Sequence, residues 1–207
     1  NLNNKIEYTS HFMNPYLGPE FSDFEIEKFL KRNNINYKKF DNISLEAAKL
    51  LKDGNILGWF QGKAEFGPRA LGNRSILGNP LLNFMQKEIN LRVKYRESFR
   101  PFAPVILEEK KSEWFDINTE SPYMLIVSSI AKSKLLKNHN IRKYNLEDLN
   151  INRSMIPAVT HVDCSARVQT VTLQQNKLLH ALISSFYKLT NCPILINTSF
   201  NVRGEPI

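Results

Sequence analysis

The chain has 207 residues, which is enough for one domain that buries its own core without disulfides or a structural metal. Its composition, 42% hydrophobic and 23% charged, is typical of a soluble globular protein, and no apolar run approaches the roughly 20 residues that span a bilayer, so we expect no membrane partner. Lysine and arginine number 28 against 20 aspartate and glutamate, a net charge of +8 that favours an anionic partner: a nucleic acid, an anionic lipid, or a nucleotide or phosphate ester.

The N-terminal sequence and the cysteines indicate a reducing compartment. NLNNKIEYTSHF has neither the basic nor the apolar region of a secretory signal, which predicts a cytoplasmic protein. Cys164 and Cys192 lack CxxC spacing, so they predict reduced thiols rather than a disulfide framework or a zinc site.

In chain order, the first predicted elements are an arm, two helices and a strand. Residues 1–20 are polar and contain the turn cluster PYLGPE, which predicts an arm or linker. The capping-box pattern SDFE predicts a helix over 22–32, and a second helix over 44–54 ends at a glycine. Residues 56–60 predict a short buried strand.

Residues 62–80 show no sustained period and contain four glycines and two prolines, which predicts a loop. So long a loop is unusual in a compact domain and is therefore a candidate for function.

The second half of the chain continues the alternation. We expect a third helix over 82–94, strands over 102–107, 123–130, 156–162 and 168–173, a helix over 176–189 and a strand over 193–196. Residues 131–153 are rich in lysine and asparagine and predict an excursion from the core. Together these elements predict an α/β domain with a mixed sheet.

Cations occur near the predicted ends of several elements. They are Arg69 and Arg74 in the loop, Lys94, Arg96 and Arg100 after the third helix, Arg167 at the start of a strand, and Arg203 in the closing segment. Arginine suits bidentate binding of phosphate or carboxylate, and a neighbouring glycine lets backbone N–H groups approach an anion. The residues therefore predict an anion binder of unknown chemistry.

A plainer alternative is that these arginines form surface ion pairs. Their sequence neighbours include Glu65, Glu97, Asp163 and Glu205, and each such pair would contribute less than ~1 kcal/mol. The chain contains neither a Walker motif nor GxGxxG, so the standard phosphate-binding loops do not decide between the two interpretations.

Two further groups of side chains could line a site. The alternation of His161 and Asp163 would place both on one face of a strand, although a structural hydrogen bond is the simpler interpretation. Asn197, Ser199 and Asn201 share a side if their strand continues, and they would offer neutral donors and acceptors to a ribose or carbamoyl group.

Four segments in this order resemble a known family. They are GWFQGKAEFGPRALGNRSILGNP, VKYRESFRPFAPVILEE, THVDCSARVQTV and NTSFNVRGEPI, and they are similar to the C-terminal domain of the O-carbamoyltransferases of nodulation-factor and antibiotic biosynthesis. The resemblance covers nearly the whole chain apart from residues 131–153. Cys164 stands where the family usually has glycine, and Lys63 where it often has arginine.

The resemblance implies one part of a two-part enzyme. An N-terminal actin-like domain would hold a metal and transfer the carbamoyl group to an acceptor hydroxyl. A C-terminal YrdC-like domain would make carbamoyl-adenylate from carbamoyl phosphate and ATP, with Mg2+ and release of pyrophosphate. We therefore expect residues 1–20 to be a linker from the actin-like domain and residues 21–207 to be the YrdC-like domain, truncated at its C-terminal end and without a metal site of its own.

The same resemblance assigns roles to residues. It implies catalytic roles for Arg69, Lys94 and Arg167, and binding of substrate or nucleotide by Arg74, Arg96, Arg100, His161, Asn197, Ser199, Asn201 and Arg203. No side-chain nucleophile is needed, because fixed cations would position the anionic substrates and offset their repulsion.

A non-catalytic nucleotide- or RNA-binding YrdC-like module is the alternative. The positive charge favours it, but nucleic-acid binders usually spread cations along one face among exposed aromatic residues. Here the arginines fall in separate glycine-bearing motifs, as expected if they converge on one small anion, so we do not expect a nucleic-acid partner.

Overall fold

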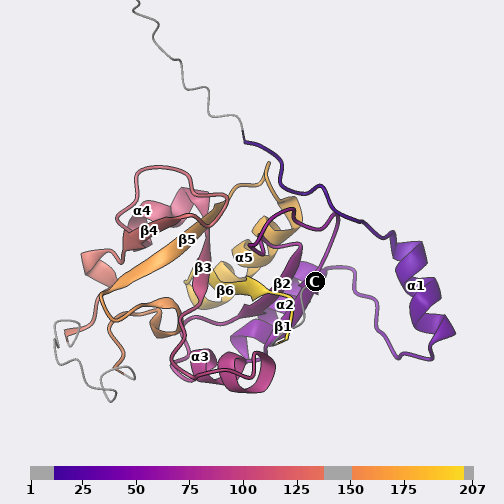
Figure 1. The fold of residues 1–207 in the computed structure, drawn as a ribbon, viewed down its shortest axis with the longest axis horizontal. Coiled ribbons are helices and arrows are strands. Elements are labelled where there is room, and N and C mark those ends of the chain that lie inside the picture. Colours follow the sequence, from indigo (N-terminus) through magenta and orange to yellow (C-terminus); the bar gives the residue numbers. More distant parts are fainter. Residues whose placement is uncertain (1–11, 138–150, 203–207) are drawn as a thin grey trace, which may run out of the picture.

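The computed structural model describes residues 12–137 and 151–202. Their centre is a six-stranded mixed sheet with the strand order β1-β2-β6-β3-β5-β4, in which β3 and β5 are parallel and the other neighbours antiparallel. Figure 1 shows this sheet with helices beside it, so the predicted α/β class with a mixed sheet is confirmed. The strands are β1 (Leu57–Phe60), β2 (Arg74–Gly78), β3 (Ala103–Leu107), β4 (Ile126–Ser129), β5 (Ser165–Val171) and β6 (Ile194–Ser199).

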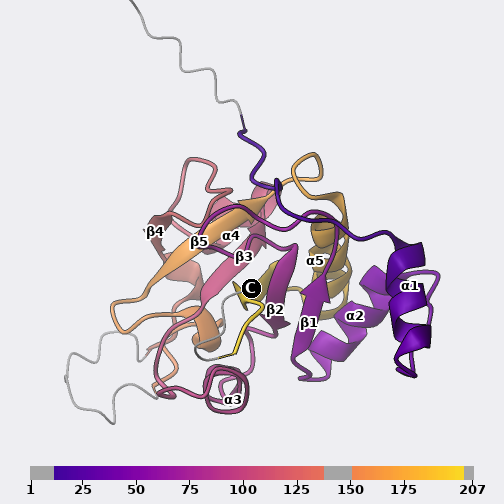
Figure 2. The same ribbon diagram turned by 45° about the vertical axis from the view of Figure 1, so that its right-hand side comes forward.

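The core forms where two helices meet this sheet. Helices α2 (Ile43–Lys52) and α5 (Lys177–Thr190) pack against each other and against the strands (Figure 1, Figure 2). Leu51, Leu182 and Ile194 are fully buried there, and burying an aliphatic side chain of this size contributes ~1.5–3 kcal/mol. The other helices are α1 (Asp23–Arg32), α3 (Met85–Glu88), α4 (Lys111–Trp114), a π-helix (Ile89–Val93) and 3-10 turns at Glu108–Lys110, Lys132–Lys134 and Pro157–Val159.

The predicted loop over 62–80 is wrong in its second half, because it contains β2. This strand pairs with β1 on one side and with β6 on the other, and all five of its residues are buried. A strand covered on both faces shows no alternation of polar and apolar residues, so periodicity did not reveal it.

The predicted strand over 156–162 is also wrong. Pro157 begins a 3-10 turn there, and proline lacks the N–H that a strand interior needs. A further turn follows, so His161 and Asp163 do not share a strand face. Cys164 lies in this turn with φ of 62°, the left-handed conformation that glycine adopts without strain.

The predicted third helix is shorter than 82–94 and changes pitch. After α3 the chain widens into the π-helix, a feature often found near functional sites. Within it the buried amide of Asn90 donates to the carbonyls of Ser98 and Arg100, at 3.0 and 2.8 Å. The π-helix therefore holds the segment that carries Arg96 and Arg100.

The N-terminal segment contacts the loop between β1 and β2 through a short stretch and then leaves it. Tyr16 forms an isolated bridge with Glu65, and the N–H of Gly18 donates to the carbonyl of Ala64 at 2.9 Å. The capping box predicted for α1 is present, but the helix buries none of its residues, and it lies at the periphery in Figure 1 and Figure 2. The boundary at residue 20 stays a prediction.

Part of the predicted excursion over 131–153 lies outside the described residues. Among the helices in the described ranges, none combines the length and apolarity that crossing a bilayer requires.

Candidate functional site: an arginine-lined pocket

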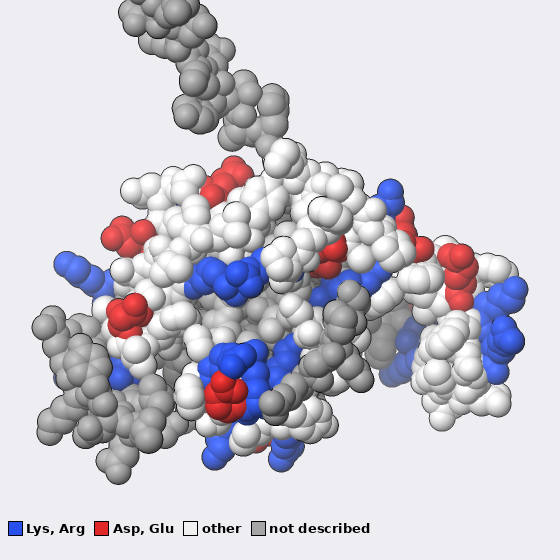
Figure 3. All heavy atoms as spheres, in the orientation of Figure 1, with Lys and Arg blue, Asp and Glu red and all other residues white. Residues whose placement is uncertain are grey.

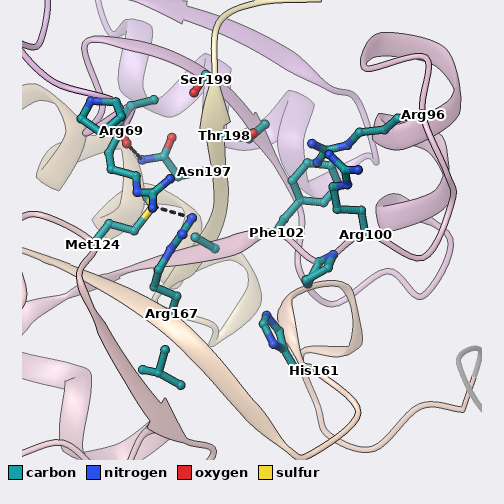
Figure 4. A pocket seen from close by; sticks show the side chains of 15 residues that line it. Arg69, Arg96, Arg100, Phe102, Met124, His161, Arg167, Asn197, Thr198 and Ser199 are labelled. Carbon is teal, nitrogen blue, oxygen red and sulfur yellow. Dashed lines mark hydrogen bonds between the residues drawn. The ribbon is translucent and has the colours of Figure 1, made fainter. Parts of the chain in front are cut away.

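A cavity of about 450 Å³ opens at one side of the sheet, where five separate segments converge. Figure 4 shows the cationic side chains around it, and Figure 3 shows lysine and arginine gathered about the hollowed middle of this face. The predicted site residues in its lining are Arg69, Arg96, Arg100, His161, Arg167, Asn197 and Ser199. We call this cavity the arginine pocket.

Arg69 and Arg167 bring like charges together without acceptors. The Nε atom of each is buried and has no hydrogen-bond partner, and Nη2 of Arg167 has only the weak acceptor Sδ of Met124 at 3.9 Å. Burial first, and the charge of Arg69 second, lower the pKa of the Arg167 guanidinium. Unpaired buried donors beside a second cation favour the binding of an anion, which would satisfy both.

Asn197 forms the floor of the pocket next to these arginines. Its Nδ2 donates to the carbonyl of Ala70 at 2.9 Å and to Oε1 of Gln169 at 2.7 Å, while its Oδ1 is buried with no donor. Asn197 on β6 pairs with Ala103 on β3, and both residues line the pocket. The first of these hydrogen bonds fixes the backbone carbonyl of Ala70, the residue after Arg69.

Arg96 and Arg100 line the opposite wall. Nε of Arg96 donates to Oδ1 of Asn90 at 2.7 Å, and its guanidinium lies 5.1 Å from the ring centroid of Phe102. Burial, followed by the charge of Arg100, lowers the pKa of Arg96. Arg100 pairs with Glu97, as the ion-pair alternative expected, yet still lines the pocket.

Lys94 lies in an adjoining hollow of about 760 Å³ that shares Arg96, Arg100 and Ser199 with the arginine pocket. Its Nζ donates to the carbonyls of Ser199 (2.5 Å) and Asn201 (2.8 Å) and to Oδ1 of Asn201 (2.8 Å). Burial, with a smaller contribution from Arg96, lowers the pKa of Lys94 to about 8. Lys94 therefore ties the end of β6 to the π-helix.

Arg74 lies on β2 and does not line the arginine pocket. Its guanidinium donates to the carbonyls of Gln61, Gly62, Asn73 and Pro19 at 2.6–3.0 Å and lies 3.6 Å from the ring centroid of Phe60. Arg74 therefore links the N-terminal segment to the loop, because one guanidinium nitrogen donates to the carbonyls of both Pro19 and Gly62.

Glu65 organises the loop that carries Arg69. Rather than pairing with an arginine side chain, its Oε1 accepts the backbone N–H groups of Leu71 (2.7 Å), Asn73 (2.7 Å) and Arg74 (3.2 Å). These three N–H groups are therefore already engaged and do not face an anion, whereas the Nε atoms of Arg69 and Arg167 have no acceptor. Gly72 has φ of 109° and packs so close to Leu179 that a Cβ would come within 2.3 Å of it.

His161 lies between the arginine pocket and another hollow of about 420 Å³. Burial lowers its pKa, and Asp163 and Arg167 act in opposite directions on it. Asp163 accepts from the N–H and Oγ of Ser165 and so caps its own turn. Arg203 and Glu205 lie outside the described residues.

Sequence reasoning missed Met124, Thr198 and Gln169. Met124 lies in the pocket wall with φ of 56°, and nothing in its sequence context signals that conformation. Thr198 could have been found, because it lies inside the NTS run that was singled out. Within the described ranges, no three His, Cys, Asp or Glu side chains cluster as metal ligands would.

Comparison with known proteins identifies this domain type. The sequence model of the family described as carbamoyltransferase C-terminus matches residues 48–207. An uncharacterized protein of Synechocystis sp. is 48% identical over 93% of the chain, and the nodulation protein NolNO of Sinorhizobium fredii is 41% identical over 93%. The 3'-hydroxymethylcephem-O-carbamoyltransferase of Amycolatopsis lactamdurans is 38% identical over 77%.

The matched region is a minority of each relative. The chain covers 32% of the Synechocystis protein, 26% of the nodulation protein and 27% of the cephem enzyme, so it spans about a third or less of their length. The resemblance inferred from the four sequence segments is confirmed.

Proposed function

Because the chain belongs to the family of carbamoyltransferase C-termini, we propose that it binds carbamoyl phosphate and ATP and forms carbamoyl-adenylate. The carbamoyl group then passes to an acceptor hydroxyl. The cephem relatives are O-carbamoyltransferases by name, which supports this kind of product.

One observation carries the proposal: the buried Nε atoms of Arg69 and Arg167 have no acceptor and share one cavity. Two adjacent cations with unpaired donors are unfavourable until an anion with several acceptor oxygens lies between them. A phosphate group is such an anion, and both substrates carry phosphate.

The reaction balances with water as a reactant. Carbamoyl phosphate, water and ATP give carbamoyl-adenylate, phosphate and pyrophosphate. Water first hydrolyses the bond between the carbamoyl group and the phosphate of carbamoyl phosphate, which gives carbamate and phosphate. A carbamate oxygen then forms a bond to the α-phosphorus of ATP, and the bond from that phosphorus to the bridging oxygen breaks as pyrophosphate leaves. Negative charge builds on the oxygens of the α-phosphate and the leaving group, and fixed cations stabilise it.

The described residues divide this work. Arg69 and Arg167 bind phosphate oxygens, while Arg96 and Arg100 on the opposite wall hold the second anion. Lys94 positions the end of β6, where Ser199 lines both hollows. The described residues that line the arginine pocket include no carboxylate, so Mg2+ would enter bound to the triphosphate, as magnesium in such sites is often held by substrate phosphates.

We place the transfer to the acceptor in an N-terminal actin-like domain with its own metal, outside the sequence matched here. The division of labour explains why the arginine pocket needs cations and amides but no nucleophile.

The test is release of pyrophosphate by the full-length protein with ATP, Mg2+ and carbamoyl phosphate. We expect release that requires carbamoyl phosphate and that falls at least ~100-fold in Arg69→Ala and in Arg167→Ala. Folded protein that releases no pyrophosphate would contradict the proposal. Binding of RNA with a steep salt dependence, in place of saturable ATP binding, would favour the alternative of a non-catalytic module.

A further inference from the structure

A further hollow, of about 590 Å³, adjoins the loop that carries Arg69. Its lining includes the rings of Phe21, Phe60 and Phe66, and we call it the aromatic hollow. It shares Pro68, Arg69, Ala70 and Ser199 with the arginine pocket. One ligand with an anionic end and a flat apolar end could therefore reach both.

The rings in the aromatic hollow are open to such a ligand. The side chain of Phe66 is 79% exposed and that of Phe60 is 46% exposed. Phe60 is fixed in place, because the guanidinium of Arg74 lies 3.6 Å from its centroid and the ring of Phe21 lies 6.1 Å away. Exposed aromatic faces held beside an anion-binding pocket are the recurring arrangement for binding a nucleobase by stacking.

We propose that the aromatic hollow binds the base of the nucleotide whose phosphates lie in the arginine pocket, with Phe66 as the stacking residue. This inference rests on the proposed function and adds to it the place and chemistry of base recognition. The competing position is the polar hollow around Lys94, whose lining includes the exposed ring of Tyr95. Each hollow has one glutamate in its lining, Glu97 in the competing hollow and Glu65 in the aromatic hollow, so the preference rests on the three phenylalanine rings of the aromatic hollow.

The experiment compares ATP with inorganic tripolyphosphate, which has the same anionic chain and no base. Both affinities are measured by calorimetry in the full-length protein and in Phe66→Ala. We expect the variant to bind ATP about tenfold more weakly, the effect of losing one stacked ring, and to bind tripolyphosphate as before. Phe66→Trp retains a ring and keeps the affinity for ATP.

Two control variants sharpen the result. Phe24 is 74% exposed on α1, away from both cavities, so Phe24→Ala binds both ligands normally. Tyr95→Ala reports on the competing hollow. A loss of ATP affinity in Tyr95→Ala that is absent in Phe66→Ala overturns the placement.

The outcomes separate the two proposals. ATP affinity unchanged in Phe66→Ala, or lost equally for ATP and tripolyphosphate, contradicts base stacking but leaves phosphate binding in the arginine pocket intact. A parent protein that binds neither ligand overturns both this inference and the proposed function.

Discussion

At the scale of single residues, the two arginines that favour anion binding in the pocket also lower the stability of the ligand-free protein. Arg167 carries a buried donor without an acceptor next to the charge of Arg69. Arg167→Met should therefore raise the free energy of unfolding of the ligand-free protein by about 1 kcal/mol and weaken pyrophosphate binding at least tenfold. Urea unfolding with and without pyrophosphate measures both. A variant less stable than the parent without ligand would contradict this account of the arginine pair.

The pH dependence of stability reports on Lys94. Its folded-state pKa of about 8 lies below the value near 10.4 of an unfolded chain, so the unfolded state binds the proton more strongly. The contribution of Lys94 to stability therefore increases as pH rises from about 8 to 10.5, by on the order of 3 kcal/mol.

The matched comparison is Lys94→Met, which lacks this titration. Urea unfolding of both proteins between pH 7 and 10 should show the free-energy difference shifting in favour of the parent as pH rises. A difference that stays constant over that range would mean that Lys94 keeps an ordinary pKa.

At the scale of elements, Glu65 is a positioning residue for the loop before β2. Its Oε1 accepts three backbone N–H groups, so Glu65→Gln should lower the free energy of unfolding by about 1–2 kcal/mol and weaken pyrophosphate binding. If Glu65 acts through the placement of Arg69, the binding effect disappears in the background of Arg69→Ala. Equal effects in both backgrounds would assign Glu65 a purely structural role.

The end of α5 offers a separate test of the fold. Asn191 caps this helix with φ of 58°, a conformation that asparagine and glycine tolerate better than alanine. Asn191→Ala should lower the free energy of unfolding by about 1 kcal/mol and should also lower the thermal midpoint. Asn191→Gly should keep a free energy of unfolding close to that of the parent. Equal losses in the two variants would show that the side chain, not the backbone conformation, matters there.

Sequence reasoning succeeded where local patterns decide structure. The capping box of α1 and the apolar side of α5 predicted both helices with boundaries within a residue or two. It failed where tertiary contacts decide: β2 is buried on both faces, and Pro157 ends what looked like a strand. The π-helix likewise depends on the buried contacts of Asn90.

At the scale of the whole molecule, the candidate site is a convergence of distant segments. Residue type and resemblance predicted which arginines matter, and the fold brings Arg69, Arg100 and Arg167 to one cavity. No local pattern could show that Arg74 turns toward backbone carbonyls or that Glu65 uses the loop's N–H groups. Both residues contact the N-terminal segment, which is distant in sequence: Glu65 forms a bridge with Tyr16, and Arg74 donates to the carbonyl of Pro19.

The central claim is that Arg69 and Arg167 hold a phosphate of the nucleotide between them. A crystal structure of the full-length protein with a non-hydrolysable ATP analogue tests it most directly. We predict phosphate oxygens at ~3 Å from Nε of both arginines, which satisfies the two unpaired donors. Phosphates bound elsewhere, with both Nε atoms still lacking an acceptor, would contradict the account.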